Sequence, residues 1–454
     1  MMLRWLVCCV ALAVAGCSTQ KPWINEPVST VAPDPQRSAD DDRDPTILMA
    51  VLFSGGGARA AAFGYGVLLE LQANRFEWAG RDTNLLDKVD LVGGVSGGSI
   101  VAAYFATHGS ARLPRFEREY LRQDFQENLL SYALRPGNLV ALSSPWFGRS
   151  HLLAERLDSL YGAATFGDLA SRKGHPDLLI TATDMSLGTG FEFSKAQFDL
   201  ICSNLQSVPV SFAVAASSSV PLLLSPVTLR NFAGQCKPPE VVGDAWEDYR
   251  TRLYREQARS YLDSKNRPYI HLLDGGLSDN LGVRRFLDSA LAEGGLRPVL
   301  QRAGIAAGVV RKLVLVSVNS ERDPSTNIDM SDRLPGAAEV LDTLVFGAGA
   351  RATKETQEFL ADVTRQWKGE LAQRFPGGKD VFANDAEVHV VQVNLRDAPD
   401  DQDLPQRTKL LQIPTALTIP GEDVTQLIAA GRATLRESPE FKALVQTLQK
   451  SRAP

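Results

Sequence analysis

The sequence has few histidines and few cysteines for its length, which limits the chemistry that it can carry. Its 454 residues include five of each, and none of them form a cluster with the spacing of a zinc site. We therefore predict no metal site. An excess of positive charge is also lacking, since the net charge is −5 and the pI is about 5.7. Nothing in this balance suggests nucleic acid as a partner.

The chain also lacks an apolar run long enough to cross a bilayer, which takes about 20 residues. The first apolar stretch, Leu6–Ala15, is shorter than that. Residues 200–229 carry no charge, but serines and prolines interrupt them repeatedly. A membrane-spanning helix would not be broken in this way. We interpret these residues as buried core of a globular protein.

Residues 1–16 have the features of a bacterial lipoprotein signal peptide. Arg4 precedes the short apolar stretch, and the small residues Ala15 and Gly16 precede Cys17, so the segment resembles a lipobox. This resemblance implies cleavage before Cys17 and acylation of the new N-terminus, with an ordinary signal peptide or an uncleaved anchor as alternatives. Because Ser18 follows the cysteine, we expect an envelope lipoprotein sorted to the outer membrane, where the acyl chains hold the protein on the bilayer.

Three further segments follow the signal peptide. Residues 17–45 comprise the lipidated cysteine and a stretch rich in Pro, Ser and Asp, which predicts a disordered tether. We assign residues 46–320 to a catalytic domain and 321–454 to a helical extension with one additional strand, packed on that domain. Cys8 and Cys9 leave with the signal peptide, so Cys202 and Cys236 remain. A disulfide between them and two buried thiols are equally compatible with the sequence.

Short β-branched segments alternate with helical patterns from residue 47 onward. Strands are expected at 47–53, 91–95, 178–183, 269–273, 312–318 and 387–394. Helices are expected near 60–75, 98–107, 114–133, 151–161, 246–264, 281–293 and 421–449. This alternation predicts an α/β fold with a mostly parallel central sheet covered by helices on both faces.

A glycine-rich loop joins the first predicted strand to the first predicted helix. Gly55, Gly56 and Gly57 allow the backbone to turn sharply and to direct several N–H groups to one point. The start of the helix adds partial positive charge there. Such a loop suits a phosphate or the oxyanion of an acyl-transfer reaction. With Ala60, the loop also fits the loose pattern of a dinucleotide-binding turn.

A G-x-S-x-G motif surrounds Ser96 at the end of the predicted strand 91–95. Gly94, Gly97 and Gly98 are the small neighbours that permit the strained strand-to-helix turn of a nucleophile elbow. The motif also arises by chance in glycine-rich chains, but its place between a strand and a helix favours a nucleophilic serine.

The third motif begins with Asp274 at the end of the predicted strand 269–273. Gly275 and Gly276 follow it, so the carboxylate can face an open cleft; a common Asp-Gly turn is the alternative. A triad with histidine would best use His389, from the order of the residues along the chain. His389 and His271 both lie within predicted strands, however, which favours Asp274 as the base.

The order of the three motifs resembles the patatin-like phospholipase family. The resemblance implies a three-layer α/β/α sandwich and a Ser–Asp dyad, here Ser96 as nucleophile and Asp274 as base. It also implies an oxyanion hole formed by Gly55, Gly56, Gly57 and Gly97. Arg59 matches the basic residue of the family's glycine loop, whereas Ala60 replaces the last glycine of that loop.

The similarity extends over about residues 47–285 and includes three shorter blocks. These are Thr165–Leu169, Ala182–Asp184 and Ala216–Pro221. Arg59 has three possible roles, namely to position the first helix, to attract phosphate headgroups, or to form a structural ion pair. Trp146 and Phe147 suit either a lipid contact or, preferably, buried core.

From this resemblance we expect a serine lipid acyl hydrolase of the phospholipase A type, acting on lipid or phospholipid without a cofactor. The acyl-serine mechanism requires no metal. A general carboxylesterase or thioesterase is one alternative, and a non-catalytic lipid-binding envelope lipoprotein is another. A nicotinamide-dependent enzyme is disfavoured, because it would leave the motifs at Ser96 and Asp274 unexplained.

Overall fold

The computed structural model describes most of the chain after residue 20. The described residues are 21–31, 43–241, 248–322, 327–330, 332–336, 340, 343, 348–373, 380–399 and 407–450. The predicted signal peptide, residues 1–16, and the predicted lipidation site Cys17 lie outside the described residues.

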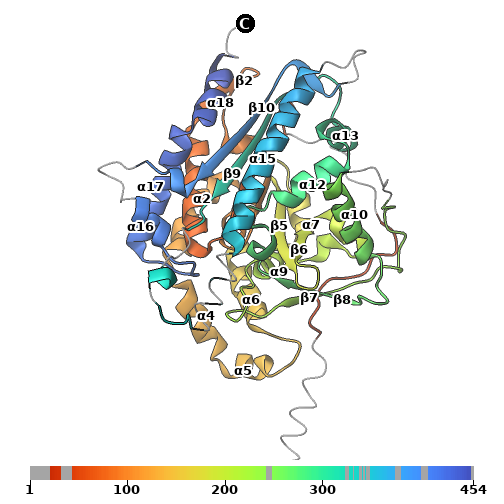
Figure 1. The fold of residues 1–454 in the computed structure, drawn as a ribbon, viewed down its shortest axis with the longest axis vertical. Coiled ribbons are helices and arrows are strands. Elements are labelled where there is room, and N and C mark those ends of the chain that lie inside the picture. Colours follow the sequence, from red (N-terminus) through yellow and green to blue (C-terminus); the bar gives the residue numbers. More distant parts are fainter. Residues whose placement is uncertain are drawn as a thin grey trace, which may run out of the picture.

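An eight-stranded sheet forms the centre of the molecule, in the order β10-β9-β1-β4-β5-β8-β7 with β6 paired to β5 (Figure 1). Its strands are β1 (Ile47–Phe53), β4 (Val89–Gly94), β5 (Asp177–Asp184), β6 (Thr189–Phe193), β7 (Val227–Arg230), β8 (Tyr269–Leu273), β9 (Val310–Asn319) and β10 (Phe382–Asn394). The pairs from β10 through β5 are parallel, and the pairs that involve β6, β7 and β8 are antiparallel. The predicted α/β fold with a mostly parallel sheet is confirmed. A small hairpin of β2 (Arg75–Trp78) and β3 (Arg81–Asn84) stands apart from the sheet.

Helices occupy most of the connections between the strands. They are α2 (Gly57–Ala73), α3 (Gly97–Arg112), α4 (Phe125–Ala133), α5 (Pro136–Leu142), α6 (Arg149–Tyr161), α7 (Phe166–Ala170), α8 (Lys195–Leu200), α9 (Val210–Ser217), α10 (Tyr249–Tyr261), α11 (Gly276–Asp279), α12 (Arg284–Ala292), α13 (Leu296–Arg302), α15 (Ala348–Ala372), α16 (Arg407–Gln412), α17 (Gly421–Glu437) and α18 (Pro439–Lys450). In the part of the chain that the structure describes, no helix is at once long and apolar enough to cross a membrane. The uncharged residues 200–229 instead contain α9 and β7, both largely buried.

The alternation of side chains along β1 explains the three layers. Met49, Val51 and Phe53 belong to a core that also contains residues of α2, α3 and α17. Leu48 and Leu52 point the other way, into a second core with residues of α12 and α15. A strand covered by helices on both faces is apolar throughout, which is why the sequence ILMAVLF reads as one continuous hydrophobic run.

The C-terminal region is part of the same sheet and the same core. β10 pairs with β9 along its length, and α17 packs directly on α2 (Figure 1). A Cβ atom at Gly66 of α2 would lie 2.2 Å from the carbonyl oxygen of Ile428, so the two helix backbones are in contact. The helix expected over 421–449 is divided at Ser438, because Pro439 restricts the preceding residue to extended backbone and starts a new helix.

Residues 21–31 are packed against the domain, although their composition predicts a disordered tether. Asn25 is buried and donates to Ser203 Oγ and to the Arg230 carbonyl oxygen, both at 2.9 Å. Pro27 forms a β-bridge with Ser203, and the Trp23 ring lies 5.5 Å from that of Tyr269. For residues 21–31 the prediction of disorder is therefore wrong. The buried amide of Asn25 and the ring of Trp23 make contacts that the composition of the segment does not reveal.

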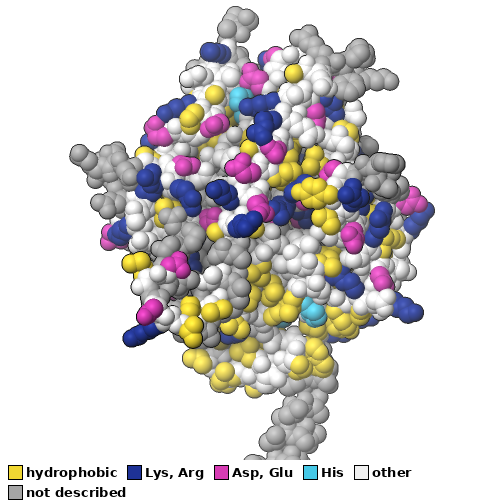
Figure 2. Space-filling view, viewed as in Figure 1, with side chains coloured by type: hydrophobic (Ala, Val, Ile, Leu, Met, Phe, Trp, Pro, Cys, Tyr) yellow, Lys and Arg dark blue, Asp and Glu magenta, His cyan; other side chains and the backbone are white. Residues whose placement is uncertain are grey.

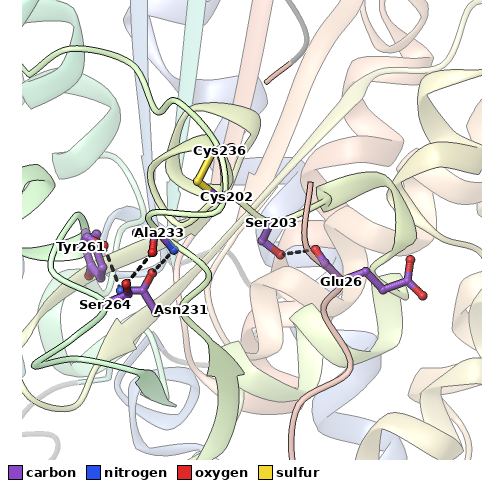
Figure 3. Close-up of a disulfide and its surroundings, with 8 residues drawn as sticks. All are labelled: Glu26, Cys202, Ser203, Asn231, Ala233, Cys236, Tyr261 and Ser264. Atoms are coloured by element: carbon purple, nitrogen blue, oxygen red, sulfur yellow. Dashed lines mark hydrogen bonds between the residues drawn. A yellow bond between two sulfur atoms is a disulfide. The ribbon is translucent and has the colours of Figure 1, made fainter. Parts of the chain in front are cut away.

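A disulfide between Cys202 and Cys236 secures the loop that receives this segment. Figure 3 shows the bridge beside the hydrogen bond from Ser203 Oγ to the Glu26 carbonyl oxygen, 3.1 Å long. The Asn231 amide on the other side of the bridge donates to the Tyr261 carbonyl oxygen at 2.9 Å. The structure therefore selects the disulfide from the two alternatives that the sequence left open.

Loss of this disulfide is expected to lower the free energy of unfolding by about 3–4 kcal/mol, because the bridge closes a long loop. The two cysteines are 34 positions apart in the sequence. Chemical denaturation of the wild type and of the double variant Cys202→Ala, Cys236→Ala measures the difference. A reductant should destabilise the wild type alone; equal sensitivity of both proteins would contradict the prediction.

Candidate active site

The loop between β1 and α2 has the backbone geometry of an anion-binding turn. Gly56 and Gly57 have φ values of 142° and 60°, a region that side chains strongly disfavour. A Cβ atom at Gly57 would also lie 2.3 Å from the carbonyl oxygen of Ala416. That oxygen accepts the Ala58 N–H at 2.7 Å. The C-terminal segment around Ala416 therefore holds the start of α2 in place.

The amides of this loop do not all remain open to a ligand. The Gly55 N–H donates to the Asn280 carbonyl oxygen at 2.9 Å, so Gly55 is not an oxyanion donor as predicted; its amide ties the loop to the segment after Asp274. Within the described ranges, the N–H groups of Gly56, Gly57 and Gly97 have no acceptor. These three amides, two from the glycine loop and one from the elbow after Ser96, are free to donate to an oxyanion.

Ser96 stands on a strained turn between β4 and α3. Its φ is 49° and its ψ is −123°, a conformation that costs a non-glycine residue about 1–3 kcal/mol. The Ser96 N–H donates to Ser217 Oγ at 2.9 Å, and that hydroxyl donates to the Thr181 carbonyl oxygen at 2.6 Å. These bonds hold the turn and leave the Ser96 hydroxyl for chemistry, as a nucleophile elbow requires.

The glycines of the elbow allow it to touch the glycine loop. A Cβ atom at Gly97 would lie 1.9 Å from the Gly57 carbonyl oxygen, and one at Gly98 would lie 2.4 Å from that of Ser54. Gly94 is equally constrained, since its Cβ atom would lie 2.5 Å from the Gly98 carbonyl carbon. The backbones of the two motifs are therefore in direct contact, which places the amides of Gly57 and Gly97 in one small region.

Asp274 lies at the end of β8, and hydrogen bonds fix its backbone and one carboxylate oxygen. Its N–H donates to the Ser219 carbonyl oxygen at 3.0 Å, and its Oδ1 accepts the Gly276 N–H at 2.8 Å. Gly275 is needed because a Cβ atom there would lie 2.2 Å from the Thr181 carbonyl oxygen. Oδ2 is buried and forms no regular hydrogen bond with the described residues.

The fold brings Ser96 and Asp274 together from positions far apart in the sequence. Both side chains are only 6% exposed. Burial raises the pKa of Asp274 to about 6, although the Gly276 N–H and, more weakly, the Ser96 hydroxyl stabilise the carboxylate. All five histidines are described, and their ring nitrogens bond elsewhere.

Arg59 is almost fully buried beneath the glycine loop. Its Nε donates to the Ser320 carbonyl oxygen at 2.9 Å, and its other nitrogens bond the Ile413 carbonyl oxygen and Thr415 Oγ1. Burial lowers the pKa of the guanidinium to about 9. Of the three roles considered from the sequence, these contacts favour a positioning residue that ties the C-terminal segment to α2.

The family model described as patatin-like phospholipase matches residues 51–287. This match covers more than half of the chain and contains the glycine loop, Ser96 and Asp274. The chain belongs to this family. The predicted membership is therefore confirmed. No curated protein matches the sequence.

Several solved structures resemble this patatin-like chain at low sequence identity. Human GIVD cytosolic phospholipase A2 is 15% identical with a TM-score of 0.47, covering 90% of this chain and 64% of that chain. ExoU–SpcU from the type III secretion system of Pseudomonas aeruginosa gives 20% identity and a TM-score of 0.26 over 45% of this chain and 43% of that chain. VipD from Legionella pneumophila is 11% identical with a TM-score of 0.33, covering 97% of this chain and 73% of that chain. The patatin-like chain spans less than two thirds of the length of the human protein.

The structure adds residues that the motifs of this patatin-like chain did not indicate. Ser217 lies in a small-residue block that resembles the family, and only its contact with the Ser96 N–H gives it a function. Asn280 closes the glycine loop through its carbonyl oxygen. Ser320 Oγ and Ser54 Oγ both donate to the Gly55 carbonyl oxygen at 3.1 Å. Contacts made through backbone carbonyl oxygens cannot be recognised in a sequence. Only the serine-rich block Ala216–Pro221, which contains Ser217, could have indicated one of these residues.

In the described part of this patatin-like chain, no group of histidine, cysteine or acidic side chains could hold a metal ion. The site therefore consists of a serine hydroxyl, a buried carboxyl and three open backbone amides. A hydroxyl, a carboxyl and amides of this kind have the chemistry of a nucleophile, a base and a set of oxyanion donors.

Proposed function

We propose that this chain is a serine lipid acyl hydrolase of the phospholipase A type, with Ser96 as nucleophile and Asp274 as general base. The observation that carries the proposal is the buried Asp274 carboxyl next to the Ser96 hydroxyl on a strained elbow, with the histidines bonded elsewhere. Membership in the patatin-like phospholipase family supports an ester-linked lipid as the substrate.

The proposed reaction has two halves. Ser96 Oγ attacks the ester carbonyl carbon while Asp274 accepts the hydroxyl proton at Oδ2, the oxygen without a regular hydrogen bond. The amides of Gly56, Gly57 and Gly97 donate to the oxyanion that forms. The tetrahedral intermediate then collapses, and the alcohol leaves with the proton from Asp274. In the second half, Asp274 takes a proton from water, the hydroxide attacks the acyl-serine, and the fatty acid is released as Ser96 regains its proton.

Burial of Asp274 suits the carboxyl to this role. A pKa of about 6 makes the carboxylate a stronger base than an exposed aspartate, while most of it is still ionised at neutral pH. A buried group whose pKa is shifted in this way is typical of catalytic sites. The open amides are already held in place by contacts of the glycine loop, so little reorganisation is needed as charge develops.

The proposal includes attachment to the bacterial envelope through acylated Cys17, with sorting to the outer membrane and exposure to the periplasm or the exterior. The lipobox-like residues before Cys17 support it. The disulfide between Cys202 and Cys236 agrees with a location outside the cytoplasm, because such bonds persist in oxidising compartments.

Labelling by a long-chain fluorophosphonate tests the dyad directly. The reagent should modify Ser96, as identified by peptide mass, and the labelling rate should fall about tenfold per pH unit below pH 6. The sign follows from the raised pKa, since Asp274 acts as a base only when ionised and loses that form as the pH falls through about 6.

Two variants complete the labelling experiment. Asp274→Asn should react slowly and without this pH dependence, and Ser159→Ala, an exposed serine on α6, should react like the wild type. Labelling of a different residue, or equal rates at pH 5 and pH 8, would overturn the proposed dyad.

A further inference from the structure

Seven large apolar side chains stand exposed on one end of the molecule. They lie on α4 and at its C-terminal cap, on α5, and in the loops that follow α5 and α9, and each is at least 38% exposed. We name this set the apolar face: Leu130, Leu134, Leu139, Val140, Trp146, Leu222 and Leu223. Trp146, expected to be core, is thus exposed. Figure 2 shows hydrophobic side chains gathered at the lower end of the view, where α4 and α5 lie in Figure 1.

Hydrogen bonds join the segments of the apolar face into one surface. The Arg149 guanidinium donates to the Leu222 carbonyl oxygen at 2.6 Å, which fixes the loop after α9 beside the start of α6. On the other side of α6, Tyr132 of α4 donates to Glu155 Oε2 at 2.8 Å. Because α6 anchors both neighbours, the exposed leucines belong to a built surface of the domain.

The chain segment that runs from the middle of α4 through α5 to the middle of α6 carries charges of one sign. No acidic residue occurs between Glu127 and Glu155, whereas Arg135 and Arg149 both occur there and both are exposed. An apolar surface with cations at its edge suits the interface of a bilayer that carries anionic headgroups. A tryptophan such as Trp146 is common at that interface.

The apolar face is next to the candidate active site. The carbonyl oxygen of Ser219 accepts the Asp274 N–H at 3.0 Å, and Leu222 follows Ser219 by three residues. Ser219 Oγ also donates to Ser150 Oγ of α6 at 2.9 Å. The chain therefore passes from the base of the dyad to the apolar face within a few residues.

The first described residues of the chain, from Lys21 onward, lie close to the same end of the molecule. His151 Nε2 lies 3.4 Å from the Pro22 carbonyl oxygen, and the His151 ring stacks on Phe147, the neighbour of Trp146, with 5.1 Å between ring centroids. Cys17 precedes Lys21 by four residues, which can span at most about 14 Å. An acyl chain on Cys17 would therefore hold this end of the domain against the bilayer.

We propose that the apolar face docks on the surface of a lipid bilayer, with the acylated N-terminus holding it there. The attachment through Cys17 rests on the proposed function. The leucines enter the boundary between headgroups and acyl chains, and Arg135 and Arg149 bind lipid phosphates. This orientation places the segment from Ser219 to Leu222, which contacts Asp274, near the lipid surface and α18, at the opposite end in Figure 1, away from it.

Environment-sensitive fluorescence on the full-length chain tests the orientation. The dye NBD is attached to Leu223→Cys in the apolar face or to Gln449→Cys, an exposed position on α18. Vesicles of phosphatidylcholine with phosphatidylglycerol are then added, and labelling of the intended cysteine is confirmed by peptide mass. The emission of the dye at 223 should shift to the blue while that at 449 stays unchanged. No shift at 223, or equal shifts at both positions, overturns the proposal.

Acidic side chains introduced into the apolar face provide the second part of the test. The double variant Leu134→Asp, Leu139→Asp should lower the ratio of docked to free label at 223 at least tenfold, or about 1.4 kcal/mol. The matched control is Leu253→Asp, because Leu253 is 52% exposed but lies on α10. Equal docking of both variants would contradict the proposal. A shift that grows with protein concentration in the absence of vesicles would also overturn it, since it would identify a second copy of the chain as the occupant.

Two other measurements test the proposed function independently of docking. Turnover of a short-chain soluble ester tests the dyad without any bilayer, and the intact mass of the membrane-extracted protein tests acylation of Cys17. A chain that docks but hydrolyses no ester, or that carries no lipid, retains the docking inference and loses the corresponding part of the proposed function.

Discussion

Replacement of Ser96 by alanine is expected to lower the turnover of a short-chain ester by at least about 10⁴-fold. The variant retains the oxyanion donors but has no atom that can form the acyl intermediate, and loss of a nucleophile of this kind removes most of the rate enhancement. Initial rates at saturating substrate measure the effect. The fold should survive, because the elbow is held through the Ser96 N–H and not through its hydroxyl.

The thermal midpoint of Ser96→Ala should therefore be close to that of the wild type. Ser159→Ala is the matched control, since it removes a hydroxyl from an exposed turn of α6. Retention of even a tenth of the wild-type rate by Ser96→Ala would exclude Ser96 as the nucleophile.

Replacement of Asp274 by asparagine is expected to abolish most turnover and yet to stabilise the protein at pH 8. The pKa of the carboxyl is about 6 in the folded chain against 3.8 as its ordinary value. At pH 8 the group is ionised in both states, so folding buries a charge at a cost of about 3 kcal/mol, which asparagine avoids. Asparagine can still accept the Gly276 N–H through its amide oxygen.

The gain in stability should depend on pH in one direction only. At about pH 3 the carboxyl is mostly protonated in both states, and the two proteins should be nearly equal in stability; the difference grows as the pH rises from about 4 to 6. Chemical denaturation at pH 3 and pH 8 measures it. Asp82→Asn is the control, because Asp82 forms only an exposed ion pair, which contributes less than about 1 kcal/mol. A wild type more stable than Asp274→Asn at pH 8 would refute the assignment.

The sequence predicted several buried strands, and it singled out the two residues of the proposed dyad, from short motifs and patterns. Strands β1 and β8 have the bounds that were expected, because their hydrophobic residues are continuous or alternate over the full strand. Ser96 and Asp274 each precede glycines within a short motif, although the backbone atoms that require Gly97 and Gly275 belong to Gly57 and Thr181, far away in the sequence. The short strands β6 and β7 were missed, because four or five residues carry too little periodicity.

The sequence could not supply contacts between distant segments. Gly55 looked like an oxyanion donor because the motif shows three equivalent glycines, and only the fold reveals that Asn280 uses one of the amides. The order in residues 21–31 was missed for the same reason. The partners of Asn25 are 178 and 205 positions away, so no local pattern signals them.

The contact of Ala416 with the glycine loop makes the site dependent on the order of biosynthesis. The carbonyl that receives the Ala58 N–H belongs to Ala416, and the one that receives Arg59 belongs to Ile413, so both follow the glycine loop by more than 350 positions. A nascent or truncated chain therefore contains Ser96 and Asp274 well before it contains the groups that hold the neighbouring glycine loop. Synthesis of the segment around Ala416 is therefore a condition for a finished site.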